Sequence, residues 1–140
     1  EVDENGPGLL FYPLPAPKRI LETRSGFSSV CGSSSGQPVQ AGTENTLATH
    51  PCVASGISNQ AQAIVGNATV IAPQTDGYLT LWPHNATQPL AASSNFTAGQ
   101  ILNRHFTVGL DSVQGRFKYF SSATTHLVID VSGYFVPALP

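Results

Sequence analysis

Charged side chains are scarce in this sequence. Lys, Arg, Asp and Glu make up 10% of its 140 residues, whereas an ordinary soluble domain has about 25%. The net charge of −2 provides no basic surface for nucleic acid and no cationic patch for a membrane. The polar surface must therefore come from Ser, Thr, Asn and Gln, which fits an extracellular protein that packs against copies of itself or against sugars. A surface without any partner is also compatible with this composition.

Other features are missing as well. No apolar run approaches the roughly 18 residues that cross a membrane as a helix, and no basic segment followed by an apolar one indicates a secretion signal. No window repeats apolar residues at the i, i+3, i+4, i+7 spacing of an amphipathic helix. Methionine is absent throughout, so we expect a processed N-terminus or an excised domain.

The sequence consists instead of short strand patterns between turn residues, which include 13 Gly and 11 Pro. Asp76-Gly77 is typical of a hairpin turn between two of these strands. The pattern predicts one all-β domain, an antiparallel β-sandwich with one disulfide, and leaves open whether its strand order is a jelly roll or an immunoglobulin-like Greek key. Strands are predicted over residues 18–24, 43–49, 62–72, 78–82, 94–97, 101–110, 116–121 and 125–135.

The two cysteines, Cys31 and Cys52, are predicted to form that disulfide. It would close a loop of about twenty residues and so stabilise the folded state by on the order of 3 kcal/mol. A disulfide also implies an oxidising compartment. Two buried free thiols are the alternative. A metal site fits less well, because the spacing matches neither CxxC nor HxxxH. His50, His84 and His105 are scattered along the sequence, and we predict no metal and no cofactor.

The strand at residues 125–135 is apolar on both faces of its middle, so it is predicted to be central in its sheet. It also carries Asp130, whose charge would be costly if buried without a partner. Arg24 is the predicted structural partner, since a guanidinium can pair with a carboxylate through two hydrogen bonds; Arg104 and Arg116 are the alternatives. His126 lies four residues from Asp130 on the same strand, which separates the two residues by about 13 Å along the strand. They are too far apart for a direct hydrogen bond, so they cannot form a catalytic pair. No Gly-x-Ser-x-Gly motif is present either, and no catalytic residue is predicted.

The N-terminus is predicted to be an extended arm over residues 1–14, followed by a single sandwich domain over residues 15–140. The prolines at positions 13 and 15 remove hydrogen-bond donors and confine this segment to a sheet edge or to a contact between subunits. The segment can be held by its own domain or can add as a strand to the next subunit's sheet and so build a fibre. The predicted assembly residues are the large apolar side chains Leu9, Leu10, Phe11, Tyr12 and Leu14.

Two further sets of residues are candidates for contacts with sugars. Tyr78 and Trp82 share one face of a predicted strand and could form a stacking platform, although core packing is the favoured interpretation. Three Asn-x-Thr triplets match the glycosylation signal. They start at Asn67, Asn85 and Asn95, and Asn85 is the best acceptor because it lies in a predicted loop.

Several of these motifs occur in the order found in a known family. They are Leu-Glu-Thr-Arg at 21–24, Ala-Ile-Val-Gly-Asn-Ala-Thr-Val at 63–70, Gly-Tyr-Leu-Thr-Leu-Trp-Pro at 77–83, Ser-Asn-Phe-Thr-Ala-Gly-Gln at 94–100, and Thr-His at 125–126 with Asp130 and Gly-Tyr-Phe at 133–135. Together they resemble a β-rich domain that recurs in secreted and cell-surface proteins of bacteria. The resemblance covers about residues 9–135. The family usually has Asp where Glu22 stands, and the longer acid could shift a contact with Arg24.

The resemblance implies an extracellular structural or adhesive role and contributes no catalytic residues. We therefore expect a non-enzymatic protein of the bacterial cell surface that assembles with copies of itself into a filament or adhesive fibre. Glycans are further possible partners, whereas nucleic acid and a membrane span are not expected. The alternative is a carbohydrate-binding accessory module of a larger secreted enzyme.

Overall fold

The computed structural model of the chain describes residues 8–31, 36–90 and 92–138. These residues form eight strands and one short 3-10 turn. In chain order the elements are β1 (Leu9–Glu22), β2 (Glu44–Ala48), η1 (Val53–Ser55), β3 (Ala63–Ile71), β4 (Gly77–Pro83), β5 (Ser94–Phe96), β6 (Ile101–Gly109), β7 (Arg116–Ser121) and β8 (His126–Pro137). In the part of the chain that is described, no helix is long and apolar enough to cross a membrane.

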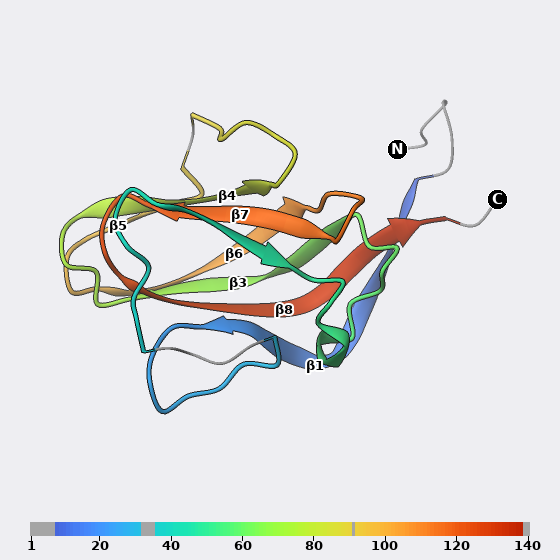
Figure 1. Cartoon of the computed structure of the whole chain (residues 1–140), viewed down its shortest axis with the longest axis horizontal. Helices are drawn as coiled ribbons and strands as arrows, with labels where there is room; N and C mark the ends of the chain where they lie inside the picture. Colours follow the sequence, from blue (N-terminus) through green and yellow to red (C-terminus); the bar gives the residue numbers. More distant parts are fainter. Residues whose placement is uncertain (1–7, 32–35, 91, 139–140) are drawn as a thin grey trace.

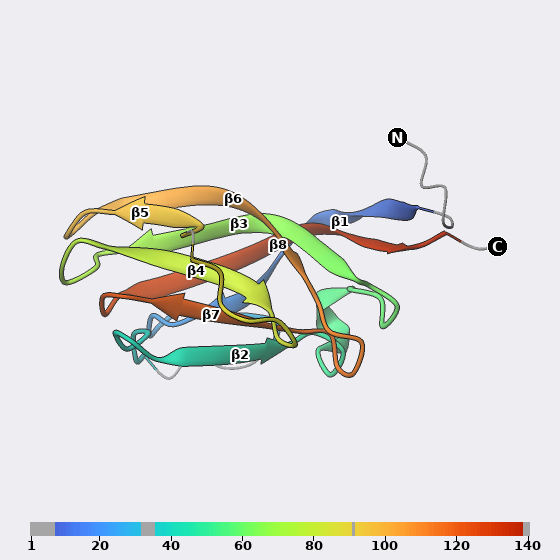
Figure 2. The same ribbon diagram turned by 90° about the horizontal axis from the view of Figure 1, so that it is seen from above.

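The strands form two four-stranded antiparallel sheets that face each other (Figures 1 and 2). One sheet has the order β1-β8-β3-β6 and the other has the order β2-β7-β4-β5. The pairs β1·β8, β2·β7, β3·β6 and β4·β5 are nested, as in one long hairpin whose tip lies between β4 and β5. Rolling this hairpin up adds the contacts β3·β8 and β4·β7. This arrangement is the jelly roll.

The prediction of an antiparallel sandwich with one disulfide is therefore confirmed, and the strand order that was left open is the jelly roll. The Cys31 and Cys52 sulfur atoms are bonded, with their Cα atoms 5.1 Å apart. The Asp76-Gly77 turn, however, does not join a hairpin, because β3 and β4 belong to different sheets. Asp76 instead accepts a hydrogen bond of 2.8 Å from the backbone N–H of Ala98.

The core lies between the sheets and is built from alternate residues of their strands. On β8, Leu127, Ile129 and Val131 are fully buried and point inward. The opposite sheet contributes Leu79 and Phe117, which are also almost completely buried. Because side chains alternate across a strand, the residues between these positions face outward. The outward position of Asp130 follows from this register.

Strand β1 consists of two halves. Its N-terminal half pairs Leu9–Pro13 with residues 133–137 of β8, and its C-terminal half pairs residues 18–22 with residues 128–131. Between Pro13 and Lys18 the pairing shifts, so that residues 14–17 bulge out of the ladder. Pro15 and Pro17 lie in this bulge, where they interrupt no ladder hydrogen bond. The predicted boundary between an arm and a domain, at residues 14 and 15, falls inside it.

Candidate functional site

The partner of Asp130 is Arg19 and not Arg24, so the predicted ion pair is wrong. Arg19 lies opposite Asp130 in the β1·β8 ladder, and its Nε donates a hydrogen bond of 2.9 Å to Oδ1 of the aspartate. Arg24 follows the end of β1, beyond the Glu22–Val128 pair, which carries its backbone away from Asp130. Hydrogen bonding to Asp130 raises the pKa of Arg19 against the opposing effect of burial.

Arg24 is bound to Glu22, whose side chain is fully buried. The guanidinium donates hydrogen bonds of 3.0 Å to Oε2 and 2.9 Å to Oε1, and the backbone N–H of Arg24 donates another of 2.9 Å to Oε2. Arg19 adds a contact of 3.2 Å to Oε1. Burial acts to raise the pKa of Glu22, but the hydrogen bonds from Arg24 and the charges of Arg24 and Arg19 together outweigh it, so the pKa is lowered. Glu22 therefore stays ionised inside the protein.

The Leu-Glu-Thr-Arg and Thr-His motifs contact each other at Thr23, the residue after Glu22. Thr23 Oγ1 accepts a hydrogen bond of 2.9 Å from the backbone N–H of Leu127 and lies 2.9 Å from His126 Nδ1. His126 thus contacts a threonine at the sheet edge. His126 and Asp130 pair with Ile71 and Asn67 of β3, four positions apart along the ladder. This cluster is a structural joint between β1 and β8.

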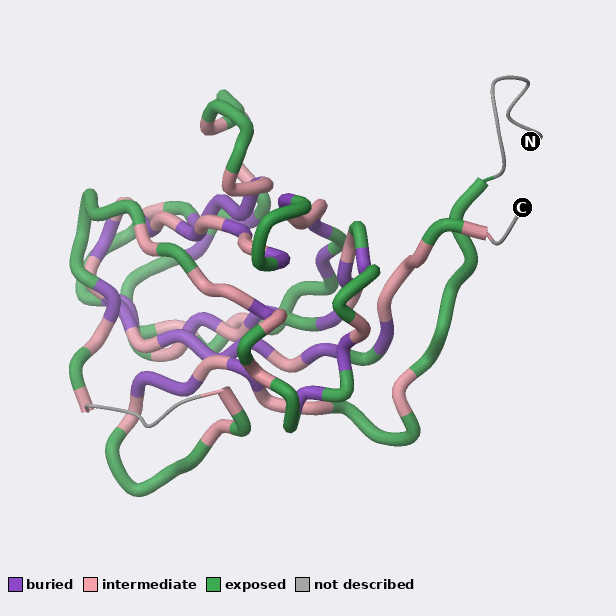
Figure 3. The backbone as a smooth tube through the Cα atoms, turned by 45° about the vertical axis from the view of Figure 1, so that its right-hand side comes forward, coloured by how far each residue is buried: buried purple, intermediate pink, exposed green. Residues whose placement is uncertain are grey.

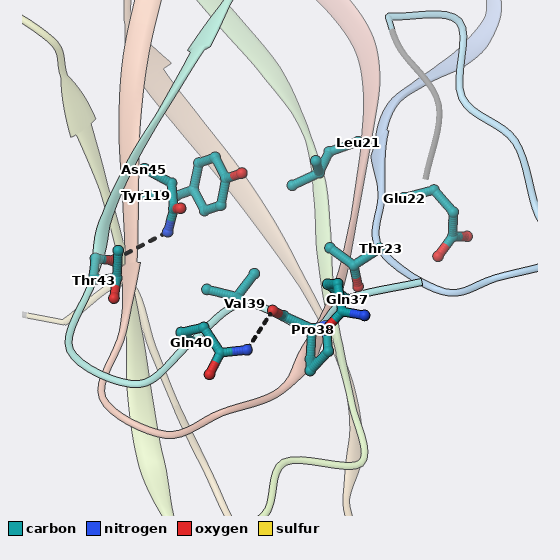
Figure 4. A pocket seen from close by; sticks show the side chains of 10 residues that line it. All are labelled: Leu21, Glu22, Thr23, Gln37, Pro38, Val39, Gln40, Thr43, Asn45 and Tyr119. Atoms are coloured by element: carbon teal, nitrogen blue, oxygen red, sulfur yellow. Dashed lines mark hydrogen bonds between the residues drawn. The ribbon is translucent and has the colours of Figure 1, made fainter. Parts of the chain in front are cut away.

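A small pocket of about 230 Å³ lies beside this joint, where the edges of β1 and β2 separate (Figure 4). Its lining amides are occupied by local hydrogen bonds. Gln40 donates to the carbonyl of Pro38 over 3.3 Å, and Asn45 donates to the carbonyl of Thr43 over 3.1 Å. The carboxylate of Glu22 is bound by the two arginines. The pocket therefore offers few unsatisfied polar groups to a ligand.

Tyr78 and Trp82 do not form an exposed platform. Tyr78 is 37% exposed, whereas Trp82 is only 3% exposed. Both lie on the outer face of β4, and the connection between β4 and β5 passes over that face in both ribbon views (Figures 1 and 2). Tyr78 packs against Phe120, with ring centroids 5.9 Å apart. The favoured interpretation, packing of Trp82 inside the protein, agrees with its burial, and the sugar platform is wrong.

The three asparagines of the glycosylation triplets are all exposed. Asn67 lies on the outer face of β3 and Asn95 on β5, while Asn85 lies in the loop after β4. The scattered histidines do not converge on a metal. Among the described residues, no group of three His, Cys, Asp or Glu side chains lies close enough to hold an ion.

The predicted assembly residues lie on a two-stranded ribbon, formed by the N-terminal half of β1 and the end of β8, that projects from the sandwich (Figures 1 and 3). Here the first segment joins its own sheet. Leu9, Leu10, Phe11 and Tyr12 are 45–47% exposed, which is unusual for four successive large apolar side chains. Leu14 differs from them, since it is half-buried in the bulge and packs against the core.

Aromatic pairs stabilise both faces of this ribbon. On one face Phe11 packs on Phe135, with ring centroids 5.2 Å apart. On the other face Tyr12 stacks on Tyr134 at 5.9 Å. The tyrosine face borders an apolar groove of about 490 Å³. The groove is lined by Leu10, Tyr12, Ser58, Gln60, Tyr134, Val136, Pro137 and Ala138.

Comparisons with known proteins add little to this geometry. No family model matches the chain, and no curated protein matches it. Among solved structures, the coat protein of Tobacco streak virus is similar over 100% of this chain and 94% of its own, with 11% sequence identity and a TM-score of 0.40. A likeness this distant supports no conclusion about the present chain.

Arg19 is the site residue that the sequence interpretation missed. Counting alternate residues back from Leu21 would have placed Arg19 on the same face of the strand as Leu21. The structure has a register shift between Arg19 and Leu21, with Ile20 buried in the core, and this shift brings Arg19 to the outer face beside Asp130. No composition or spacing signal marks such a bulge.

Proposed function

We propose that this protein is a non-enzymatic extracellular structural subunit that assembles by strand exchange. In this proposal the N-terminal half of β1, Leu9–Pro13, leaves its own sheet and pairs with the end of β8 in the next copy. Each copy then donates one strand and accepts another. If the rotation that relates one copy to the next does not close the chain of copies into a ring, the result is a fibre. The observation that carries the proposal is the division of β1 into two halves by the bulge.

The bulge supports exchange because it interrupts the ladder between the two halves of β1, so that the N-terminal half can leave β8 while the C-terminal half stays paired. Residues 18–22 stay in the sandwich through Ile20, which is buried, and through the ion pairs of Arg19 and Glu22. Leu14 packs against the core. The Leu9–Pro13 segment has none of these anchors and contacts mainly the end of β8. A swapped arm makes the same contacts in a second copy, so exchange costs little beyond the change in chain direction at the bulge.

The apolar side chains of the ribbon give the proposal a driving force. A ribbon that projects into water leaves Leu9, Leu10, Phe11 and Tyr12 half-exposed. Bringing a second copy alongside would cover part of this surface, at about 25 cal/mol for each Å² removed from water. The exposed area of four such side chains is well below the roughly 800 Å² per partner of a standard interface. Face contacts alone would therefore be weak, whereas in a swapped strand the main-chain hydrogen bonds that the arm otherwise makes within its own chain join one copy to the next.

The setting of this function follows from two features. The bonded cysteines fit an oxidising compartment, and the sequence resembles a domain of secreted and cell-surface bacterial proteins. We therefore place the assembly outside the cell, at a bacterial surface.

The exchange can be tested with an engineered disulfide across the ribbon. Tyr12 and Tyr134 are directly opposite in the β1·β8 ladder, and such pairs have a Cα separation suited to a disulfide. We expect the oxidised Tyr12→Cys/Tyr134→Cys variant to form covalent multimers at high protein concentration, seen as a ladder on non-reducing gels. The native disulfide remains intact in this experiment.

The matched control is Thr46→Cys/Lys118→Cys, because these residues are opposite each other in the β2·β7 ladder. No bulge divides that pair of strands, so neither strand has a segment that could exchange separately. The control should cross-link only within one chain. If the Tyr12→Cys/Tyr134→Cys protein is also purely monomeric after oxidation, at concentrations up to the solubility limit, strand exchange is wrong.

A further inference from the structure

Another concave surface lies at the end of the sandwich from which the ribbon projects. We call it the polar cleft; its volume is about 390 Å³. Its walls are formed by the connection from β2 to β3, the start of the loop after β4 and the loop from β6 to β7, with the end of β8 at one side. Its lining residues are His50, Asn59, Gln60, Ala61, Gln62, Asn85, Leu110, Asp111, Ser112 and Pro137.

The one carboxylate of the cleft is already neutralised. Asp111 is 3% exposed, and Arg116 contacts its Oδ2 through both Nε and Nη2 at 2.7 Å. The backbone N–H of Arg116 donates a further hydrogen bond of 2.8 Å to Oδ1. His84 Nδ1 lies 3.5 Å from Oδ2. Burial acts to raise the pKa of Asp111, but the hydrogen bonds from Arg116 and Gln114 and the charge of Arg116 together outweigh it, so the pKa is lowered. Asp111 thus forms a fixed ion pair that organises the loop.

The amides of the cleft are in the opposite situation. Within the described residues, the side chains of Asn59, Gln60, Gln62 and Asn85 have no hydrogen-bond partner in the protein, in contrast to Gln40 and Asn45 in the pocket of Figure 4. The backbone of Gln62 is fixed, since its N–H donates to Phe135 and its carbonyl accepts from Leu110. The cleft therefore holds amide groups that can each donate and accept hydrogen bonds.

His50 also lines the cleft, and its ring packs against Gly115 in the loop from β6 to β7. Nε2 of His50 is buried and has no hydrogen-bond partner among the described residues. A buried polar atom without a partner destabilises the folded state. The backbone N–H of His50 is bonded to the carbonyl of Gln114, so the residue is held in place at the cleft wall.

The cleft continues into the apolar groove of the ribbon. Gln60 and Pro137 line both cavities. Tyr12 and Tyr134 lie in the groove, so a ligand that extends from one cavity to the other meets amides first and tyrosine rings next. Strand exchange would preserve this arrangement, because the arm of a second copy brings its own Tyr12 to the same place.

From this geometry we propose that the polar cleft binds a neutral saccharide. A sugar without charge presents neighbouring hydroxyl groups that amides can bind in pairs, and its C–H faces pack against tyrosine rings and proline. A charged ligand fits less well, because Asp111 and its partner Arg116, the Asp/Glu/Lys/Arg side chains that the described residues place at the cleft, already neutralise each other. The site differs from the Tyr78 and Trp82 face, and its occupancy does not depend on assembly.

The test uses an array of neutral oligosaccharides from bacterial, fungal and plant walls, followed by NMR titration of the labelled full chain with each glycan that is retained. We expect binding by at least one neutral glycan, with shifts of the Gln60, Gln62 and Asn85 side-chain amides. The Gln60→Ala/Asn85→Ala variant should lose about tenfold or more in affinity, since two hydrogen bonds are removed. Its melting temperature should match that of the unchanged protein.

Asn103→Ala is the control. Asn103 is an exposed amide on β6, away from the cleft, and its removal should leave glycan affinity unchanged. Three results would overturn the proposal. They are an array without any neutral glycan bound, retained glycans that shift residues elsewhere, or equal losses in the cleft variant and the Asn103 variant. Each differs from a failure of strand exchange, which is measured by cross-linking.

Discussion

At the residue scale, Glu22 illustrates how the sandwich keeps a carboxylate away from water. Its side chain is fully buried, and burying an isolated ion is costly. The cost is offset by three hydrogen bonds from Arg24 and one from Arg19. Removing one member of such a cluster leaves the others without partners, which typically costs about 3–5 kcal/mol. The cluster therefore makes the folded state sensitive to protonation.

The pH dependence follows from the pKa of Glu22, which is lowered in the folded protein. A lowered pKa means that the unfolded chain binds the proton more tightly, so the stabilisation is complete above the ordinary pKa of about 4.3 and is lost as the pH falls below it. We expect the melting temperature of the unchanged protein to drop steeply below about pH 4. The Glu22→Gln variant should be less stable at pH 7 and should lose part of this drop.

Thermal melts between pH 2.5 and pH 7, followed by the fluorescence of Trp82, measure this effect. Asp111 also has a lowered pKa, so the melting temperature of Glu22→Gln should still fall at low pH, but by less than that of the unchanged protein. Glu44→Gln is the control, since Glu44 pairs with Lys118 at the exposed surface, where ion pairs contribute little. Parallel curves for the unchanged protein and Glu22→Gln would contradict the assigned role.

The same residues mark the limit of prediction from sequence. That Asp130 needs a cationic partner follows from its apolar neighbours. Which arginine provides it depends on the shift between Arg19 and Leu21, which arises from packing of Ile20. Trp82 is a second example: the spacing to Tyr78 correctly gives a shared strand face, but it does not show that Trp82 is buried on that face while Tyr78 is exposed.

At the element scale, β3 and β8 meet closely where their pairing shifts between Val65 and Gly66. A β carbon on Gly66 would collide with the backbone of Asp130 and Val131. The neighbouring atoms are main chain in the middle of the sheet and cannot rotate away. A glycine inside an otherwise β-branched strand is a sequence sign of such a close approach.

We therefore expect Gly66→Ala to destabilise the protein by about 3 kcal/mol or more, the upper range for overpacking. Chemical denaturation at pH 7 measures the free energy of unfolding. Gly8→Ala is the matched control, because a β carbon at Gly8 would meet open space, and it should change stability by less than about 0.5 kcal/mol. Equal effects of the two substitutions would mean that β3 and β8 do not approach as closely as described.

Strand positions were largely predictable because alternation is a local property. The strand predicted over residues 62–72 agrees with β3 to within one residue at each end, and the strand predicted over residues 116–121 has the same bounds as β7. The connection between β3 and β4 was not predictable in the same way. Asp76-Gly77 has the residues of a hairpin turn, but the two flanking strands bury their apolar faces in different sheets, and only the whole fold decides this.

At the scale of the whole molecule, the nested hairpin places the two ends of the described chain side by side. The last closing pair, β1·β8, joins residues more than a hundred positions apart. Such non-local pairs are slow to form, because the rest of the roll must be in place first. We therefore expect the N-terminal half of β1 to pair last, so that its place on β8 stays open to the arm of another copy until it closes.

This order of events leads to a prediction for a chain without residues 1–13. The second half of β1 keeps its anchors at Ile20 and Glu22, so we expect the truncated protein to fold. Its melting temperature should fall by roughly 10 °C, because the apolar contacts of four large side chains with β8 are lost. Light scattering should find monomers at concentrations where the full chain assembles.

A synthetic peptide of residues 8–14 should reverse this change by filling the vacated edge of β8. Binding to the folded state stabilises it by an amount that rises with the logarithm of the peptide concentration above Kd, so the melting temperature of the truncated chain should rise as the peptide is added. A peptide with Phe11→Ser and Tyr12→Ser keeps the backbone but lacks the aromatic contacts to Phe135 and Tyr134, and it should stabilise much less. Fibres of the truncated chain would show that assembly uses another surface. Indifference to both peptides would show that the arm cannot be supplied by a second molecule, which strand exchange requires.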